Sequence, residues 1–171
     1  MKACFIGLGY IGLPTAIVAA DKGIEVIGVD VNAKVVETIN RGKIHIVEPG
    51  LADLAAKVVH NGGLKAQLEP EVSDVYLIVV PTPFTGDHEP DISYVEAATR
   101  SVIPFLKEGD LFIIESTSPV GTTELMAELI FAERPELKGK VYIAYCPERV
   151  LPGNIIYELV NNDRVIGGLD A

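Results

Sequence analysis

The 171-residue sequence predicts an α/β fold, a doubly wound, Rossmann-like and mostly parallel sheet with helices on both faces. Two observations support this prediction. Apolar segments of strand length alternate with segments of helical periodicity from one end of the chain to the other. In addition, the first apolar segment, residues 2–6, leads directly into the glycine-rich stretch Gly7-Leu8-Gly9-Tyr10-Ile11-Gly12, and a helix-compatible run follows over 11–20.

The later elements continue this alternation. Apolar runs predict strands over 25–29, 64–67, 75–80, 111–114, 141–144 and 164–168. Periodicity and capping residues predict helices over 33–40, from 48–50 to about 60, over 92–105 behind the cap Asp91, and over 122–133. Pro81 and Pro83 end the strand before them, since proline cannot donate a ladder hydrogen bond, and the turn-rich stretch 84–90 predicts a loop. No linker or repeat divides residues 1–171, so we expect one domain.

The glycine stretch has the spacing and context of a dinucleotide-binding loop. Gly7 would permit the tight turn from strand to helix, Gly9 the close approach of a pyrophosphate, and Gly12 close packing of the helix on the strand. The start of the helix would point free N–H groups at the phosphates. Asp30, at the end of the second strand, would accept hydrogen bonds from both ribose hydroxyls and repel a 2′-phosphate, so we expect NAD rather than NADP. The competing interpretation, in which the glycines only form turns and Asp30 only caps the next helix, does not explain why all four features occur together.

Polar clusters follow three further strand ends, at 81–83, 116–118 and 148–149. Because the carboxyl ends of parallel strands open onto one crevice, we expect these clusters to face the same ligand. Thr82 could contact the cofactor, and Thr117 or Thr123 could reach the nicotinamide, a water or the substrate. Each of these hydroxyls could instead cap a helix. Arg149 could bind an anion bidentately, and either Glu148 or Arg149 could alternatively form a surface ion pair.

Composition excludes several classes of function. The formal net charge of −10 would repel nucleic acid and anionic membranes. No apolar run is long enough to cross a bilayer, and glycines interrupt the N-terminal stretch that superficially resembles a secretion signal. Cys4 and Cys146 form no disulfide framework, and the three histidines lack the spacing of a metal site. We therefore expect a cytoplasmic protein with no metal and with neither nucleic acid nor membrane as a partner.

Seven stretches, distributed over nearly the whole chain, carry a family resemblance. They are IGLGYIGLP (6–14), VDVN (29–32), INRGKIHIVEPGL (39–51), VPTPF (80–84), GDHEPD (86–91), ESTSPVGTTE (115–124) and AYCPERVLPGN (144–154). In these stretches the chain resembles the NAD-binding domain of the UDP-glucose/GDP-mannose dehydrogenase family. GDHEPD and CPERVLPG point to the N-acetylmannosamine branch of that family more than to its UDP-glucose branch.

The resemblance implies a two-step, four-electron oxidation that takes C6 of a UDP-linked amino sugar from alcohol to aldehyde to carboxylate and consumes two NAD. It implies that Thr117 and Glu148 stand near the reacting C6 and its water, where a carboxylate suits acid–base chemistry. It also implies that Arg149 and Val150 contact the sugar nucleotide. The residues implied to contact NAD, besides the three glycines, are Tyr10, Ile11, Asp30, Thr82 and Thr123.

The chain departs from the family pattern in one respect. The nucleophilic cysteine of the family lies in a G-G-x-C motif after this domain, and neither that motif nor the catalytic lysine occurs here. Cys146 has no His or Lys beside it, so a small buried apolar role suits it better than a catalytic one. We therefore expect a cofactor-binding half that binds NAD and turns over little by itself. The central helical region, through which the family forms homo-oligomers, and the sugar-binding domain would lie outside it.

Other functions remain open at this point. A complete short-chain dehydrogenase would need a Tyr-x-x-x-Lys pair, and none of the six tyrosines has a lysine four residues later. Phosphoryl transfer would need a P-loop, and no G-x-x-x-x-G-K-[ST] occurs. A non-catalytic NAD-sensing module stays possible, although such a module would not need Thr117 and Glu148. A different UDP-sugar, glucose or N-acetylglucosamine, is the remaining alternative.

Overall fold

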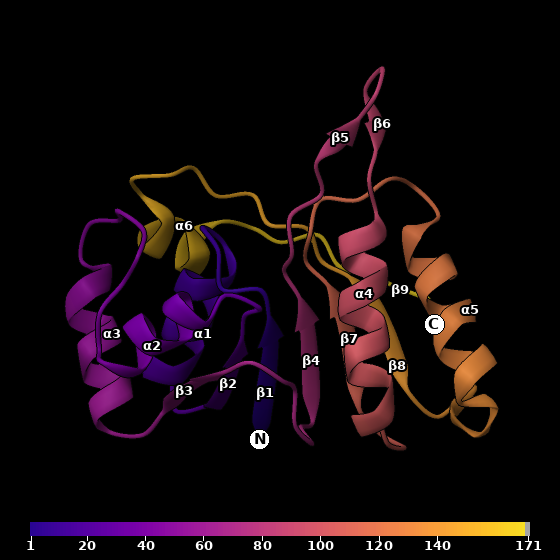
Figure 1. The fold of residues 1–171 in the computed structure, drawn as a ribbon, viewed down its shortest axis with the longest axis horizontal. Helices are drawn as coiled ribbons and strands as arrows, with labels where there is room; N and C mark the ends of the chain where they lie inside the picture. The colour runs from indigo at the N-terminus through magenta and orange to yellow at the C-terminus, as the bar shows by residue number, and fades with distance from the viewer. Residues whose placement is uncertain (170–171) are drawn as a thin grey trace.

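A seven-stranded sheet forms the centre of the molecule in the computed structural model, which describes residues 1–169 (Figure 1). Its strands, in spatial order, are β3 (Leu64–Gln67), β2 (Glu25–Val29), β1 (Lys2–Ile6), β4 (Val75–Ile78), β7 (Leu111–Ile114), β8 (Tyr142–Tyr145) and β9 (Gly167–Gly168). All of them pair in parallel except β9, which is antiparallel to β8. The chain moves outward from β1 to β3 and then returns across β1 to β4. This reversal of strand order places a ligand crevice above the carboxyl ends of β1 and β4.

Helices cover both faces of the sheet, as predicted. They are α1 (Gly12–Asp21), α2 (Ala33–Asn40), α3 (Leu51–His60), α4 (Ser93–Val102), α5 (Thr122–Glu133) and α6 (Ile155–Asn161), with short 3₁₀ turns η1 (Ile103–Phe105) and η2 (Pro135–Leu137). Alternate side chains of β1 pack into two separate cores, because neighbouring residues of a strand point to opposite faces of the sheet. Ala3 and Phe5 pack in the core that includes α1 and α3, whereas Cys4 and Ile6 pack in the core that includes α4 and α5. None of the helices in the described part of the chain is long and apolar enough to span a membrane.

The predicted bounds are confirmed without change for β1, β2, β3, β7, α2 and α5. Three predicted elements are shorter than expected. The helix predicted over 92–105 ends at Val102 and continues as η1, because Pro104 has no N–H to extend the α-helical ladder. The strand predicted over 75–80 ends at Ile78, and the strand predicted over 164–168 contains only Gly167–Gly168. Arg164, at the start of this last predicted strand, instead forms ion pairs with Glu115 and Glu148.

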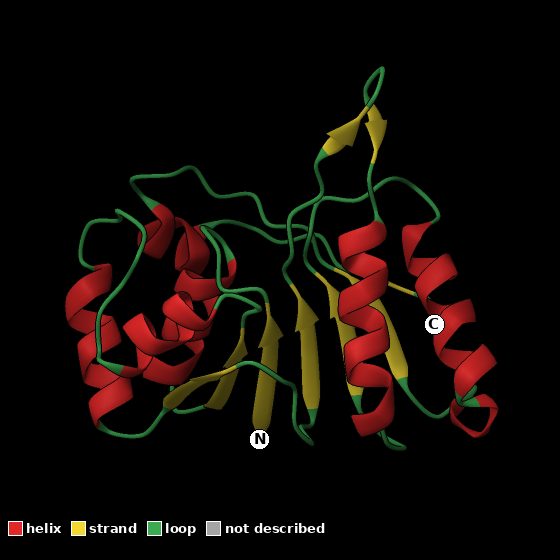
Figure 2. Ribbon diagram, in the orientation of Figure 1, coloured by secondary structure: helices red, strands yellow, loops and turns green. Residues whose placement is uncertain are grey.

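A small hairpin replaces the loop predicted over 84–90. β5 (Phe84–Thr85) and β6 (Glu89–Pro90) pair in antiparallel fashion. They project away from the carboxyl edge of the sheet (Figure 2). His88 takes the left-handed conformation at φ 69° in the tight connection between them. Sequence alone gave no strand signal here, since four exposed residues without a buried face carry no alternating pattern.

Helix α6 was not predicted, and its support comes from a distant part of the chain. The segment between β8 and β9, residues 147–166, crosses above the sheet, forms α6 beside α1 and comes back (Figure 1); we call it the return segment. The buried carboxylate of Glu48 accepts hydrogen bonds from the N–H groups of Gly153 at 2.8 Å and Ile155 at 2.7 Å. Glu48 therefore satisfies backbone donors at the start of α6 that the helix itself leaves unpaired.

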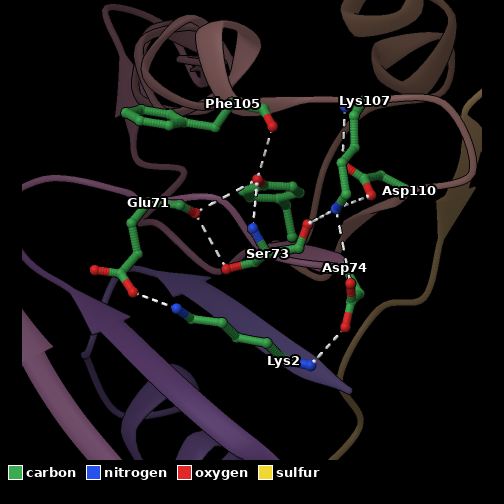
Figure 3. A network of polar contacts seen from close by, with 8 residues as sticks. Lys2, Glu71, Ser73, Asp74, Phe105, Lys107 and Asp110 are labelled. Atoms are coloured by element: carbon green, nitrogen blue, oxygen red, sulfur yellow. Dashed lines mark hydrogen bonds and ion pairs between the residues drawn. The ribbon is translucent and has the colours of Figure 1, made fainter.

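The opposite, amino edge of the sheet is closed by a network of polar contacts (Figure 3). The hydroxyl of buried Tyr76 accepts a hydrogen bond from the Ser73 N–H at 2.9 Å and donates one to the Phe105 carbonyl at 3.1 Å. Lys107 Nζ donates to Asp110 Oδ1 at 2.8 Å in the same network. Burial raises the pKa of Tyr76 to about 12. These contacts join the starts of strands far from the crevice, so their role is structural.

Candidate cofactor-binding site

A cleft of about 710 Å³ lies above the reversal of strand order, a volume typical of small-molecule sites. Its lining comes from the loop between β1 and α1, from the residues that follow β2, β3, β4, β7 and β8, and from one side of α4. The predicted site residues that line it are Gly7, Gly9, Tyr10, Ile11, Asp30, Thr82, Thr117, Glu148 and Val150. Strand ends far apart in sequence thus meet at one crevice.

The three glycines have the geometry that the sequence motif predicts. Gly7 has φ +102°, and a Cβ there would lie 2.3 Å from the Val79 carbonyl oxygen. A Cβ on Gly12 would lie 2.0 Å from the Gly7 carbonyl oxygen, so α1 could not start so close to the loop with any other residue. A Cβ on Gly9 would meet no protein atom within 4 Å. Gly7 and Gly12 are therefore required by the protein itself, whereas the space beside Gly9 is open to a ligand.

The start of α1 offers unpaired donors to an anion. Among residues 1–169, the N–H groups of Tyr10, Ile11 and Gly12 donate to no backbone or side-chain acceptor, and α1 has no side-chain cap. Free N–H groups and the positive end of the helix dipole favour a bound phosphate. The open space beside Gly9 lies in the same loop. This arrangement fits the pyrophosphate of a dinucleotide without any basic side chain.

Asp30 is held at the other end of the glycine loop. Its Oδ2 accepts a hydrogen bond from the Leu8 N–H at 3.1 Å, and its Oδ1 accepts one from the Asn32 N–H at 2.8 Å. The cap of α2 is Asn32, whose side chain accepts from the Lys34 N–H at 3.0 Å. The interpretation of Asp30 as the cap of that helix is therefore wrong. Its carboxylate keeps free lone pairs at the cleft and can accept further hydrogen bonds there.

The hydroxyl groups after β4 and β7 join neighbouring strand ends. Thr82 Oγ1 donates to the Thr117 carbonyl at 2.7 Å, and Ser116 Oγ donates to the Val80 carbonyl at 2.8 Å. Neither hydroxyl caps a helix, although Thr82 keeps acceptor lone pairs for a ligand. Thr117 is exposed in the cleft. These bonds hold the two loops together at the end of the cleft away from Asp30.

A cluster of three charged groups lies at this same end. Arg164, from the return segment, donates through Nη1 to Glu115 Oε1 at 2.7 Å and forms an ion pair through Nη2 with Glu148 Oε2. The Glu115 and Glu148 side chains are only 1% and 7% exposed. Burial raises the pKa of the Glu115 carboxyl, and the Arg164 guanidinium opposes that rise. Glu115 Oε2 is buried and has no hydrogen-bond partner in the described residues.

Three predicted site residues lie outside the cleft lining. Gly12 packs behind the glycine loop, and Arg149 is exposed beside Glu148. Thr123 lines a second hollow of about 460 Å³ at the start of α5, together with Ser118 and Tyr145. Of the adjacent pair Glu148 and Arg149, it is Glu148 that forms an ion pair, and its partner is Arg164 rather than a surface residue. The structure therefore separates Thr123 from the main cleft and joins Glu148 to a group that sequence did not suggest.

Two residues of the charged cluster were missed by sequence reasoning. Glu115 directly follows the apolar run of β7, just as Asp30 follows β2, so the same signal could have identified it. Arg164 had no such signal, because it lies in a stretch predicted as a strand. Cys146 was expected to be a buried apolar residue, and its burial is confirmed by its 6% exposure, although its thiol contacts a charged group. Its Sγ lies 3.6 Å from Arg164 Nη1.

Comparison with known proteins agrees with this geometry. The profile of the UDP-glucose/GDP-mannose dehydrogenase family, NAD binding domain, matches residues 1–171. The UDP-N-acetyl-D-mannosamine dehydrogenase of Escherichia coli K12 is 58% identical over 172 residues, covering 96% of this chain and 41% of that protein. The NDP-N-acetyl-D-galactosaminuronic acid dehydrogenase of Ralstonia nicotianae is 54% identical over 172 residues, with the same coverage.

A solved structure of a similar enzyme has the same fold over this domain. The UDP-N-acetyl-mannosamine dehydrogenase of Staphylococcus aureus superposes with a TM-score of 0.94 at 44% identity, over 99% of this chain and 42% of that one. The chain thus spans about two fifths of the length of these relatives. The glycine loop, the free N–H groups of α1 and Asp30 are the parts of such a domain that would hold NAD. The chain belongs to the UDP-glucose/GDP-mannose dehydrogenase family and is its NAD-binding domain.

Proposed function

We propose that this chain is the cofactor half of a UDP-N-acetyl-D-mannosamine 6-dehydrogenase, which oxidises the C6 alcohol of the sugar to a carboxylate with two NAD. The observation that carries the proposal is that one cleft has a dinucleotide loop at one end and Thr117 and Glu148 at the other. A protein that only sensed NAD would have no use for the polar groups at the second end. The names of the similar proteins support the choice of sugar class.

Each part of the cleft has a proposed task. The free N–H groups of Tyr10 and Ile11 bind the pyrophosphate, and Asp30 accepts hydrogen bonds from the adenosine ribose. Thr82 uses its remaining lone pairs toward the cofactor. Thr123 would contact NAD from the second hollow. Bound NAD supplies the hydride acceptor.

The substrate would lie where β7 and β8 end. We assign Glu148 to proton transfer at the C6 hydroxyl and at the water that hydrolyses the later intermediate, since each of its oxygens keeps a lone pair besides those used by Arg164 and the Arg149 N–H. Thr117, exposed in the cleft, would hydrogen-bond to the same oxygen or water. Arg149 and Val150 would contact the sugar nucleotide from the start of the return segment.

The names of the similar proteins indicate the class of sugar that the enzyme oxidises. Relatives that act on mannosamine and galactosaminuronic derivatives differ by only a few per cent in identity to this chain. The name of the Escherichia coli relative specifies an N-acetylated amino sugar linked to UDP. We propose this class of molecule as the substrate. We place the enzyme in the cytoplasm, which suits its two free, buried cysteines. Self-association would belong to the longer protein rather than to this domain.

Cofactor binding is tested first, by calorimetric titration of NAD and NADP into the chain. We expect NAD to bind, NADP to bind much more weakly, and Asp30→Ala to weaken NAD. Asp53→Ala, an exposed carboxylate on α3, is the matched control and should leave the affinity unchanged. Equal affinities for NAD and NADP, or an Asp30→Ala variant that binds NAD normally, would contradict the assignment of Asp30.

The reaction is tested in a chimaera. Residues 1–171 would replace the matching part of the Escherichia coli relative, which is 58% identical there, and NADH formation would be followed with UDP-N-acetylmannosamine. We expect activity in the chimaera and its loss on Glu148→Gln. A folded chimaera that binds NAD but never oxidises the sugar would overturn the proposed activity while leaving the cofactor assignment intact.

A further inference from the structure

The cleft has an unusual charge balance for a site that binds phosphates. The charged residues that line it are Asp30, Glu115 and Glu148, and its lining in the described chain includes no lysine, arginine or histidine. The one cation that the described structure pairs with these carboxylates is Arg164, which contacts both Glu115 and Glu148. One guanidinium between two carboxylates leaves this cluster with a formal charge of −1.

Because the cluster is buried, its net charge can interact strongly with a nearby ligand. Glu115 and Glu148 are almost fully buried, and the Arg164 side chain is 28% exposed. Charges that are shielded from water interact more strongly with a nearby ligand than charges on the surface. In addition, Glu115 uses only Oε1 toward Arg164, while its buried Oε2 has no partner in the described residues. The negative charge is thus only partly compensated by the protein.

The cluster of Glu115, Glu148 and Arg164 lies where the nicotinamide end of the cofactor should be. This placement rests on the proposed function. In the sheet, β2 carries Asp30 at its end and β7 carries Glu115, and three strand spacings separate them. That separation is about 14 Å at the usual spacing between strands. A dinucleotide with its ribose at Asp30 and its pyrophosphate at Gly9 has to extend its nicotinamide half across β4 toward β7 and β8.

We infer that Glu115, Arg164 and Glu148 together make the site selective for the oxidised cofactor over the reduced one. The nicotinamide ring of NAD⁺ carries a positive charge that NADH lacks, while the rest of the two molecules is the same. At a pH where both glutamates are ionised, a net charge of −1 beside the ring therefore stabilises bound NAD⁺ and gives NADH no such gain. Glu115 and Arg164 thereby act as specificity-determining residues. In a reaction that uses two NAD, the same preference would promote the release of NADH between the two oxidations.

The test measures the dissociation constants of NAD⁺, NADH and ADP-ribose for the chain by calorimetry at one ionic strength. In the wild type we expect NAD⁺ to bind more tightly than NADH. Glu115→Gln keeps the shape of the side chain and removes the excess charge, so the ratio of the NADH to the NAD⁺ dissociation constant should fall by about fivefold, as expected for one charge in a partly solvated site. Glu148→Gln should lower it similarly.

Arg164→Gln should raise the same ratio, because it leaves both carboxylates uncompensated. Damage to the fold would weaken both cofactors together and could not move the ratio in opposite directions in the two kinds of variant. ADP-ribose, which has no nicotinamide, should bind all of the folded variants alike. Glu128→Gln, an exposed carboxylate on α5, is the matched control for a change in total charge and should leave the ratio unchanged.

Two results would overturn the inference, and they are distinguishable. A wild-type chain that binds neither NAD⁺ nor ADP-ribose would overturn the proposed function together with the inference. A chain that binds both, but whose ratio is the same in Glu115→Gln, Glu148→Gln and the control, would overturn the inference alone. If Arg164→Gln does not fold, Glu115→Gln and Glu148→Gln still test whether the charge sets the ratio.

Discussion

Replacing Glu48 by alanine tests whether one buried carboxylate holds the return segment above the cleft. Glu48 is 6% exposed, and its two oxygens accept hydrogen bonds from the N–H groups of Gly153 and Ile155. A hydrogen bond to a charged group contributes about 1.5–3 kcal/mol. Because water can enter the space that alanine leaves, we take the lower end for each bond and expect a loss of about 3 kcal/mol in the free energy of unfolding.

This loss can be measured in two ways. For a chain of this length it corresponds to a fall of about 6–12 °C in Tm. Hydrogen exchange should show where the stability is lost, since amides in the return segment should exchange faster on the order of a hundredfold while those of β1 and β4 change less. Glu48→Gln keeps one good acceptor and should lose only about 1–2 kcal/mol.

A surface carboxylate provides the control for this prediction. Glu37 forms an exposed i,i+4 ion pair with Arg41 on α2, and such pairs contribute about 0.5 kcal/mol or less. Glu37→Ala should therefore change the free energy of unfolding only slightly. If Glu48→Ala were as mild as Glu37→Ala, or if exchange in residues 147–166 did not change, Glu48 would not be the group that holds the return segment in place.

Three further predictions concern the loop, the amino edge and the buried charge. Gly12→Ala should destabilise the chain by about 3 kcal/mol and abolish NAD binding, because its Cβ would overlap the Gly7 carbonyl oxygen; a variant that binds NAD normally in calorimetry would contradict this. Tyr76→Phe should cost about 1–2 kcal/mol in urea unfolding, because the Ser73 N–H loses its buried partner, and an unchanged midpoint would show that water replaces the hydroxyl. The folded state raises the pKa of Glu115, so its contribution to stability is full at low pH and is lost as the pH rises above about 4.3 through the raised value. The stability of Glu115→Gln relative to wild type should therefore increase as the pH rises above the ordinary range of a carboxyl group, and a difference that stays flat or falls would refute the sign.

Much of the fold could be predicted because its signals are local. The strand β1, the glycine turn and the start of α1 are contiguous in sequence, and their glycines have roles that depend on the adjacent backbone. The alternation of strand and helix segments was enough to predict the layers. The same local reasoning failed for the hairpin β5–β6, where exposed residues have no hydrophobic period.

The candidate site divides in the same way. Asp30, Thr82, Thr117 and Glu148 could be found from sequence, because each follows a strand and the carboxyl ends of parallel strands meet. Thr123 also comes after β7, at the start of α5, but it lines the second hollow rather than the main cleft. Sequence position thus predicted which loops form the site, but not the direction of every side chain in them.

The doubly wound sheet, the dinucleotide loop and the preference for NAD can all be predicted from the amino-acid sequence, since they depend on residue types at short and regular spacings. Two long-range contacts could be found only in the folded chain. Glu48 binds the N–H of Ile155, 107 residues later in the sequence, and Arg164 joins Glu148 to Glu115, which lies 49 residues before Arg164. Buried charges are stable only when paired. Which partner satisfies them depends on how distant segments cross, and no local pattern records that.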